Sequence, residues 1–361
     1  MEPIALTTSG LESSQAGASS VCALVITFNR VAVLRQCVEI LRSQTRRPDE
    51  IVVVDNGSTD GTSEWLRQQP DLTVLQQENS GVAGGIYSGL KYGYERGYSW
   101  IWINDDDAFP APDALDKLMS ATWLRPKGRV FNSLSRDISD CKRIAFHFIR
   151  YIGGNPLQRK RYDYVSDLLN EAEGPLIEGE AQFYQSSLLH REIIDKVGLP
   201  IPDLFIRGDE IEYLTRIIGA GFPTYTVPVS RVVHPQQKRE VVRILGKRLD
   251  YEPMEDLKRY YTARNAVWSD LHFPGAWGRP SLRRFRILKI FIYHQLVASI
   301  THSGTRQKLA AARIVCHGIA DGLRMNRDGR IRGRETVYRH PFLVRVAENV
   351  AGPVPPPIGQ A

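Results

Sequence analysis

Four short apolar runs between residues 21 and 105 constrain the fold of this chain more than any other feature. The runs are Val21–Thr27, Ile51–Asp55, Thr73–Gln77 and Trp100–Asn104, and helical segments lie between them. Apolar runs of this length that are rich in β-branched and aromatic residues are typical of buried strands. Alternation of such strands with helices predicts parallel βαβ units with right-handed crossovers. We therefore expect an α/β fold in which a mostly parallel sheet is flanked by helices.

The fourth run is followed by three consecutive carboxylates, Asp105, Asp106 and Asp107. Open α/β sheets bind ligands at the carboxyl ends of their strands. Three adjacent negative charges repel one another, so the fold must supply a cation or hydrogen-bond donors. Hard oxygen ligands suit Mg²⁺ or Mn²⁺, which also accept phosphate oxygens. The triplet therefore predicts a divalent metal site; the alternative is a solvated acidic turn that caps the next helix.

Two other strand ends carry candidate binding residues. Asp55 follows a buried strand, where its carboxylate could bind a nucleobase or ribose or could cap the next helix. Gly81, Gly84 and Gly85 open the helix after the third strand, and their bare N–H groups could approach a phosphate. Their spacing matches neither the Rossmann fingerprint nor a P-loop, so neither of those nucleotide sites is predicted.

A second acidic cluster lies further along the chain. A helix is expected over Ser187–Val197, and Asp209, Glu210 and Glu212 then crowd the first turn of another helix. There they either cap the helix, whose dipole favours negative charge, or supply a general base that faces the cleft. The strand Thr224–Val233 ends at His234, which could complete a metal site if it faces the acidic triplet.

Charge is unevenly distributed along the chain. Residues 281–345 contain 14 Lys and Arg against three acidic residues, whereas the net charge of the whole chain is only +7. A basic C-terminal segment on a slightly acidic body predicts contact with phosphates or with an anionic membrane face. There is no run of about 18 uncharged apolar residues, so no membrane-spanning helix is expected. The four cysteines are widely spaced and predict neither a zinc knuckle nor a disulfide framework.

Taken in order, these motifs resemble those of the family 2 glycosyltransferases, which are enzymes with the GT-A fold. The matching segments are Thr27–Arg30, Ile51–Gly61, Asn79–Gly85, Asp105–Asp107, Leu188–Arg191, Val197–Pro200, Phe205–Tyr213 and His234. Within the family, the chain looks most like the bacterial rhamnosyl- and galactofuranosyltransferases. The resemblance covers about residues 21 to 235.

The resemblance also implies roles for individual residues. The nucleotide-sugar donor would be bound by Thr27, Asn29, Arg30, Asp55, Gly81, Gly84 and Asp106. Mn²⁺ or Mg²⁺ would be held by Asp105, Asp107 and His234.

The catalytic base is expected in the second acidic cluster. His234 lies 24 residues after Glu210, which matches the spacing between catalytic and metal-binding residues in the galactofuranosyl branch. Glu210 therefore falls at the position of the base. The family usually has Asp-Asp where this chain has Asp209-Glu210, so Asp209 remains an alternative base.

Beyond the catalytic motifs, residues 257–265 resemble the Tyr-Tyr-x-x-Arg-Asn segment common in these transferases. Tyr260, Tyr261 and Arg264 would serve either interdomain packing or substrate contact. Phe285–Ile300 is predicted to be a basic amphipathic helix that lies on a membrane surface or packs on the catalytic domain. The expected organisation is a disordered tail over 1–20, a GT-A catalytic domain over 21–240, a helical basic region over 241–345 and a Pro-rich tail over 346–361.

The function implied is a metal-dependent inverting transfer of a sugar from a nucleotide-diphosphate donor to a hydroxyl of a cell-surface polysaccharide or lipid-linked glycan. UDP-galactofuranose is the first expected donor and dTDP-rhamnose the second. A nucleotidyltransferase and a non-catalytic sugar-nucleotide-binding protein are alternatives from other classes. The expected location is the cytoplasm, with peripheral contact to the inner membrane through the basic segment. Nucleic acid is not among the expected partners; binding of nucleic acid by the basic segment would be detected as salt-dependent retention on DNA.

Overall fold

The computed structural model describes residues 19–151, 159–179, 183–236, 240–244, 247–272, 288–294, 296–297 and 304–327. The Pro-rich tail predicted at 346–361, most of the N-terminal tail predicted at 1–20 and part of the helix predicted at 285–300 lie outside these ranges.

The N-terminal half of the sheet is built from parallel βαβ units, as expected. Its strands are β1 (Val21–Thr27), β2 (Glu50–Asp55), β3 (Leu72–Gln76) and β4 (Trp100–Asp105). They lie in the order β3-β2-β1-β4, and each neighbouring pair is parallel. The helices that connect them are α1 (Val31–Arg42), α2 (Thr62–Leu66) and α3 (Gly81–Glu95). All four strands therefore end at the same edge of the sheet.

The sheet continues past β4 with strands of mixed direction. These are β10 (Ser187–His190), β6 (Val130–Asp137), β11 (Thr224–His234) and β5 (Phe109–Pro110), in that order from β4. β10 is antiparallel to both β4 and β6, whereas β6 and β11 are parallel. Three further strands extend from β6 and β11, namely β7 (Arg143–Tyr151), β8 (Arg159–Tyr164) and β9 (Ile177–Glu178). The helix expected over Ser187–Val197 is wrong in its first half, because Ser187–His190 is a strand.

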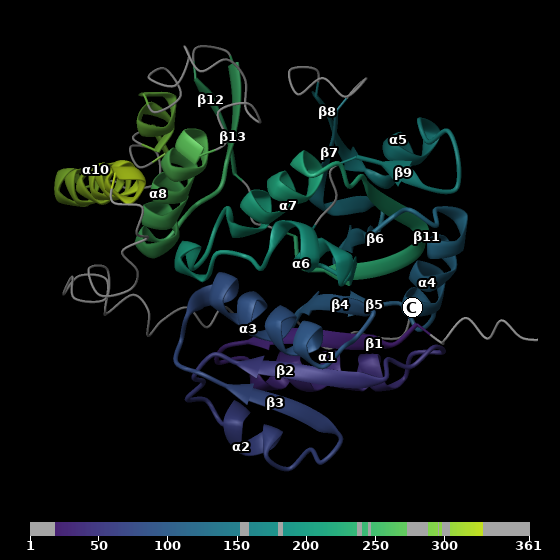
Figure 1. Cartoon of the computed structure of the whole chain (residues 1–361). Helices are drawn as coiled ribbons and strands as arrows, with labels where there is room; N and C mark the ends of the chain where they lie inside the picture. Colours follow the sequence, from purple (N-terminus) through teal and green to yellow (C-terminus); the bar gives the residue numbers. More distant parts are fainter. Residues whose placement is uncertain are drawn as a thin grey trace, which may run out of the picture.

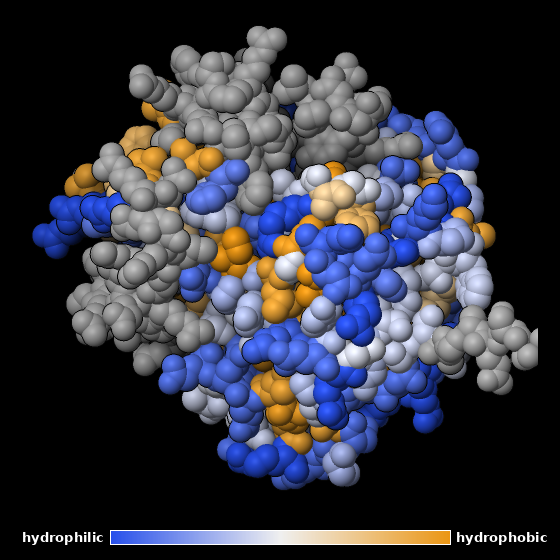
Figure 2. Space-filling model, viewed as in Figure 1, coloured by the Kyte–Doolittle hydropathy of each residue, from blue (hydrophilic) through white to orange (hydrophobic). Residues whose placement is uncertain are grey.

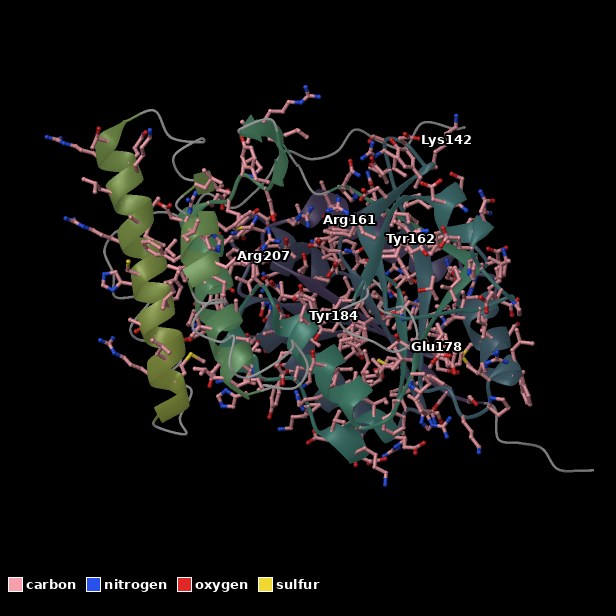
Figure 3. The ribbon with its side chains drawn as sticks, turned by 90° about the horizontal axis from the view of Figure 1, so that it is seen from above. Lys142, Arg161, Tyr162, Glu178, Tyr184 and Arg207 are labelled. Carbon is pink, nitrogen blue, oxygen red and sulfur yellow. The ribbon has the colours of Figure 1, made fainter. Side chains whose placement is uncertain are left out.

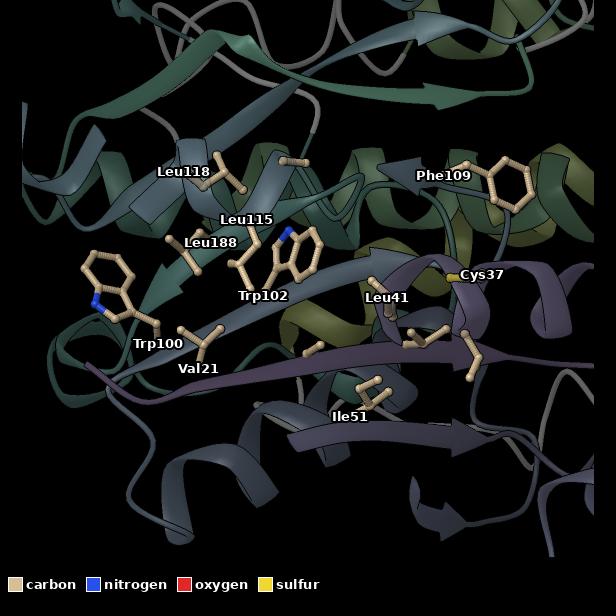
Figure 4. Close-up of a cluster of buried hydrophobic side chains, with 14 of the residues drawn as sticks. Val21, Cys37, Leu41, Ile51, Trp100, Trp102, Phe109, Leu115, Leu118 and Leu188 are labelled. Atoms are coloured by element: carbon tan, nitrogen blue, oxygen red, sulfur yellow. The ribbon is translucent and has the colours of Figure 1, made fainter. Parts of the chain in front are cut away.

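Helices cover both faces of the sheet, because successive residues of each buried strand face opposite sides. Val21, Ala23 and Val25 pack with α1 and α4 (Ala114–Leu124), in the cluster drawn in Figure 4. Cys22 and Leu24 pack with α3, α6 (Glu192–Val197) and α7 (Asp209–Gly219). Two short elements connect these layers, α5 (Val165–Asn170) and the 3₁₀ helix η2 (Pro202–Leu204). In this arrangement the carboxyl ends of β1, β4 and β11 lie at the same edge of the sheet, between the two helical layers.

The C-terminal part that the structure describes is mainly helical. The hairpin β12 (Glu240–Ile244) and β13 (Lys247–Tyr251) leads into α8 (Asp256–His272), against which α10 (Thr305–Arg327) packs (Figure 1). Gly318 and Gly322 permit close approach, since a Cβ at Gly318 would lie 2.6 Å from the Tyr260 carbonyl oxygen. The α/β sheet flanked by helices and the helical C-terminal region are thus both confirmed. Within the described part of the chain, no helix is long and apolar enough to span a bilayer.

Candidate active site

The acidic triplet meets the end of the neighbouring strand. β1 and β4 are parallel neighbours, so Thr27 and the residue that follows it lie beside the residues that follow β4. The Thr27 hydroxyl donates a hydrogen bond to Oδ2 of Asp106 at 2.8 Å. The Arg30 guanidinium donates from Nη1 to Asp106 Oδ1 at 2.6 Å and from Nη2 to Asp107 Oδ2 at 2.8 Å. One arginine therefore compensates part of the charge of two carboxylates.

His234 reaches the triplet through the pairing of the short strand β5. Phe109, two residues after Asp107, pairs with Val233 of β11. This pairing places Nε2 of His234 2.9 Å from Asp107 Oδ1 and 3.7 Å from Asp105 Oδ2. The other ring nitrogen, Nδ1, lies 2.7 Å from the carbonyl oxygen of Pro235, which can only accept a hydrogen bond. Nδ1 therefore carries a hydrogen, and Nε2 is directed at the carboxylates.

The electrostatic balance of this cluster follows from its burial. Burial by itself lowers the pKa of His234, but the charges of Asp107 and Asp105 raise that pKa to about 10. Burial raises the pKa of Asp106 to about 7, against the opposing effect of Arg30. Burial also raises the pKa of Asp105. Asp107 behaves differently, because His234 and Arg30 overcome its burial and hold its pKa below the usual range.

Three of these side chains can hold a metal ion. One oxygen each of Asp105 and Asp107 and one nitrogen of His234 all lie within 4.8 Å of one another. Two carboxylate oxygens and an imidazole nitrogen suit Mn²⁺ or Mg²⁺, which fill their remaining positions with water or phosphate oxygens. A divalent cation would replace the proton that His234 otherwise carries. The residues therefore fit the expected metal, and Asp106, which faces Thr27 and Arg30, is not part of this ligand set.

The expected nucleotide-binding residues of the first two loops form a connected network. Asp55 is 1% exposed and accepts hydrogen bonds from the backbone N–H of Ser58, at 3.0 Å, and from the hydroxyl of Ser63. Asn29 bridges to the same loop, because its N–H donates to Ser58 Oγ at 2.9 Å and its Oδ1 accepts from the N–H of Thr59 at 2.6 Å. These contacts organise the turn after β2. The N–H of Thr62 at the start of α2 is capped by Asp60 Oδ1, at 3.1 Å, and not by Asp55, whose nucleotide-binding role stays a prediction.

Gly81, the first residue of α3, faces another loop of the protein. Gly81 has a φ of +70°, and a Cβ there would lie 2.1 Å from the carbonyl oxygen of Phe205. Ala83 donates its N–H to that same oxygen at 3.0 Å. Gly84 is buried in the same first turn of the helix. The requirement for glycine at position 81 thus comes from close contact with the loop that precedes α7, which the sequence did not indicate.

The second acidic cluster lies at the start of α7, and its members have different surroundings. Asp209 is 2% exposed, whereas Glu210 is half-buried and accepts a hydrogen bond from the N–H of Gly208 at 3.1 Å. Burial, together with the neighbouring Glu210, raises the pKa of Asp209 well above its usual range. Burial therefore favours the neutral form of Asp209, and Glu210 is the member of the pair that is accessible from solvent. Glu212 is engaged elsewhere, since it pairs with Arg216 one turn later at 2.5 Å.

Two buried groups near this cluster were not singled out from the sequence. Among the residues that the structure describes, the Tyr184 hydroxyl has no hydrogen-bond partner, and burial together with Asp209 raises its pKa far above the usual value. Asn265 of α8 makes three hydrogen bonds to the loop before α7. The segment that resembles Tyr-Tyr-x-x-Arg-Asn pointed to this helix, but it gave no reason to separate Asn265 from its neighbours. Tyr260 and Tyr261 are buried against Phe205, in agreement with the packing interpretation.

Comparison with known proteins gives matches along most of the described catalytic region. The sequence model of Glycosyl transferase family 2 matches residues 22–123. Galactofuranosyltransferase GlfT1 of Mycolicibacterium smegmatis is 32% identical over 249 residues, which cover 68% of this chain and 81% of that protein. GlfT1 of Mycobacterium tuberculosis H37Rv is 33% identical over 253 residues, covering 68% and 80%. The dTDP-rhamnosyl transferase RfbF of Shigella flexneri is 23% identical over 252 residues, covering 69% and 79%.

Proposed function

Because the chain belongs to glycosyltransferase family 2 and has the GT-A fold, we propose that it transfers galactofuranose from UDP-galactofuranose to a hydroxyl of a cell-surface polysaccharide or lipid-linked glycan. The names of the two GlfT1 relatives support this donor. dTDP-rhamnose is the second candidate, supported by the more distant relative RfbF. Membership in this family argues against the nucleotidyltransferase and non-catalytic alternatives. The observation that carries the proposal is the meeting of Asp105, Asp107 and His234 at the sheet edge.

The donor side of the proposed reaction depends on the strand-end network. Mn²⁺ or Mg²⁺, when held by Asp105, Asp107 and His234, would neutralise the charge that develops on the departing nucleoside diphosphate. Arg30 orients two of the carboxylates, because its fork binds Asp106 and Asp107 together. Thr27 fixes the remaining oxygen of Asp106. These bonds hold the site in place before substrate arrives, so little reorganisation is needed during the reaction.

The acceptor side depends on the carboxylates at the start of α7. In an inverting transfer the acceptor hydroxyl attacks the sugar from the face opposite the leaving group, and a base removes the proton of that hydroxyl. Glu210 is the proposed base, because it is half-buried and can be reached by an acceptor hydroxyl, whereas Asp209 is 2% exposed and burial raises its pKa. Asp209 would then support Glu210 without competing for the proton. The two carboxyl groups thus differ in burial, which disfavours the charged form of Asp209.

The test of the donor site is calorimetric titration of UDP with and without Mn²⁺. We expect the unaltered protein to bind UDP in a manganese-dependent way and Asp107→Ala to lose that dependence. Asp116→Ala is the matched control, since Asp116 is an exposed carboxylate on α4. Thermal melts would show that both variants are folded, and Asp107→Asn would repeat the test with the side-chain volume retained.

Transfer itself is tested with a panel of donors that includes UDP-galactofuranose, UDP-galactopyranose and dTDP-rhamnose. Turnover of UDP-galactofuranose above the others supports the proposed donor, and preference for dTDP-rhamnose would replace it with the second candidate. Full manganese-dependent UDP binding and transfer by a folded Asp107→Ala protein would refute the metal site.

A further inference from the structure

The loop that carries the proposed base into the site has a costly backbone conformation. Residues 205–208 connect η2 with α7 and end immediately before Asp209. Phe205 has a φ of 64° and Arg207 a φ of 68°, and Gly208 follows with a φ of 88°. Positive φ values in residues other than glycine persist only where the surrounding structure enforces them. Some other part of the protein must therefore hold this loop.

One side of the loop is held by a single buried amide on α8. Nδ2 of Asn265 donates to the carbonyl oxygens of Leu204 at 2.9 Å, Ile206 at 3.1 Å and Arg207 at 2.7 Å. Asn265 is 1% exposed. An irregular loop lacks the regular backbone partners of a helix or strand, so buried carbonyl groups in it need donors from elsewhere. Asn265 supplies those donors from about 60 residues away in the chain.

Its neighbour Arg264 fixes the orientation of this amide. Nε of Arg264 donates to Oδ1 of Asn265 at 2.9 Å, and Nη2 of Arg264 donates to the carbonyl oxygen of Asp203 at 2.6 Å. A guanidinium can only donate, so it must face the oxygen of the amide. The NH₂ group of Asn265 is consequently turned toward the loop. The Arg264 guanidinium lies over the ring of Tyr261, with Cζ 4.5 Å from the ring centroid, and this contact holds the arginine in place.

The opposite side of the loop contacts the start of α3. The N–H of Ala83 in α3 donates to the carbonyl oxygen of Phe205. The side chains of the loop turn back to α8, where the Phe205 ring stacks on the Tyr261 ring with centroids 4.8 Å apart. Arg207 lies beside α8 (Figure 3) and forms an ion pair with Glu252. The loop is therefore held between α8 and the helix start at which the donor is expected. Its position is tied to both.

From these contacts we infer that Asn265 is a positioning residue, which sets the place of Glu210 by holding the loop 205–208 against α3. The inference rests on the proposed role of Glu210 as base. It gives the C-terminal helix α8 a part in the reaction without any contact with substrate. Substitution of Asn265 should therefore slow the chemical step more than it weakens donor binding.

The experiment compares Asn265→Asp with Thr262→Val. Aspartate has the same side-chain size as asparagine and keeps the oxygen that accepts from Arg264. It lacks the NH₂ group that donates to the carbonyl oxygens of Leu204, Ile206 and Arg207. Thr262 lies on the same helix, and within the described ranges its hydroxyl bonds to the carbonyl oxygen of Lys258 at 2.7 Å and to Met254 just before the helix, so its isosteric variant is the matched control. Steady-state kinetics with UDP-galactofuranose and an acceptor sugar, and calorimetry with UDP and Mn²⁺, are measured on both.

We expect kcat of Asn265→Asp to fall about 10- to 100-fold, with UDP affinity within about twofold of the unaltered protein, because displacement of a reacting group costs rate without loss of binding. Thr262→Val should change neither quantity. Hydrogen exchange of the amides in 205–210 should accelerate in Asn265→Asp alone. A purely structural role predicts instead a lower melting temperature with unchanged kcat in the folded protein.

The measurements separate this inference from the proposed function. Unchanged kcat or unchanged exchange in folded Asn265→Asp would overturn the positioning role. Absence of transfer by the unaltered protein would overturn the proposed function, and the exchange measurement, which needs no substrate, would then decide whether Asn265 holds the loop.

Discussion

Each of the three adjacent aspartates is tolerated because it faces a cation or a hydrogen-bond donor. Asp106 faces Thr27 and Arg30, and Asp107 faces Arg30 and His234. Asp105 Oδ2 lies 3.7 Å from Nε2 of His234, the same ring nitrogen that Asp107 contacts. Two cationic groups thus compensate three carboxylates, which leaves a net negative charge where a divalent cation is expected. The arrangement explains how a buried strand can end in three acidic residues.

The neighbouring pair at the start of α7 permits a test of the base. Glu210→Gln should lower kcat by about 10²- to 10⁴-fold, the usual contribution of a general base. Asp209→Asn should lower kcat much less, because burial raises the pKa of Asp209 and favours its neutral form, and an amide is also neutral. Turnover is measured with UDP-galactofuranose, and UDP binding of both variants serves as the control.

The opposite result would reassign the base. If Asp209→Asn alone lost turnover while both variants still bound UDP, Asp209 would be the proton acceptor and Glu210 the supporting residue.

The proximity of some site residues could be predicted from the sequence, whereas that of others could not, for physical reasons. Asp105 and His234 each end a strand and Asp107 lies just after one, so a fold with common strand ends predicted that they would meet. Asn265 was not separated from its neighbours, because a side chain that bonds to a distant loop backbone leaves no periodic pattern. The contact of Gly81 with Phe205 could not be predicted either, because it depends on the path of a loop that is distant in the sequence.

At the scale of elements, the predictions succeeded where strands and helices alternate and weakened beyond residue 130. β10 was expected as part of a helix, because Ser187–His190 is too short for its apolar residues to show a strand period. No elements were placed between 131 and 174, where the structure has β6, β7, β8 and α5. β8 carries Arg159, Lys160 and Arg161 on the periphery of the sheet, so a buried apolar run is lacking there.

One carboxylate joins several elements of the N-terminal half. Glu50, at the start of β2, accepts hydrogen bonds from Thr73 of β3 at 2.5 Å, from Tyr92 of α3 at 2.8 Å and from Tyr98 before β4 at 2.7 Å. Burial opposes ionisation of this group, but the three hydrogen bonds prevail and lower its pKa. A carboxyl whose pKa is lower in the folded state stabilises the fold fully above its unfolded pKa, and that stabilisation is lost as pH falls through the folded pKa.

We therefore expect Glu50→Gln to lower the melting temperature at pH 7 and to have a progressively smaller effect as the pH is lowered. The measurement is a series of thermal melts of both proteins from neutral to acidic pH. Glu64→Gln, at an exposed position on α2, is the control and should change little at any pH. A gap in melting temperature between Glu50→Gln and the unaltered protein that stays constant with pH would contradict the role of the ionised carboxylate.

At the scale of the whole molecule, the C-terminal helices are connected to the catalytic unit. The division predicted at about residue 240 stays a prediction, but Arg264 and Asn265 bond directly to the loop before α7. The described part of the segment predicted as an amphipathic helix buries His294 and Val297 and exposes Leu288 and Ile292. One side of this segment thus packs on protein, in line with one of the two readings, and its apolar opposite side remains exposed.

The outer face of α10 combines exposed apolar and basic residues. Leu309 is 56% and Leu323 42% exposed, and Arg306, Arg313 and Arg324 are exposed on the same helix. In Figure 2, hydrophobic and hydrophilic residues lie side by side over α10, at the left of the view. Such a face is complementary to an anionic bilayer, on which a lipid-linked acceptor would be presented.

We expect the full chain to sediment with vesicles that contain phosphatidylglycerol and not with phosphatidylcholine vesicles, and added salt should weaken the binding because surface charges are screened. Replacement of Arg306 and Arg313 by Gln should lower vesicle affinity about 10- to 30-fold, at about 1 kcal/mol for each basic residue near the surface. Arg35→Gln with Arg67→Gln, on α1 and beside α2, is a charge-matched control on a remote surface. UDP binding should be the same in all three proteins. Equal loss of vesicle binding in both double variants would show that net charge alone, and not the face of α10, directs the protein to a membrane.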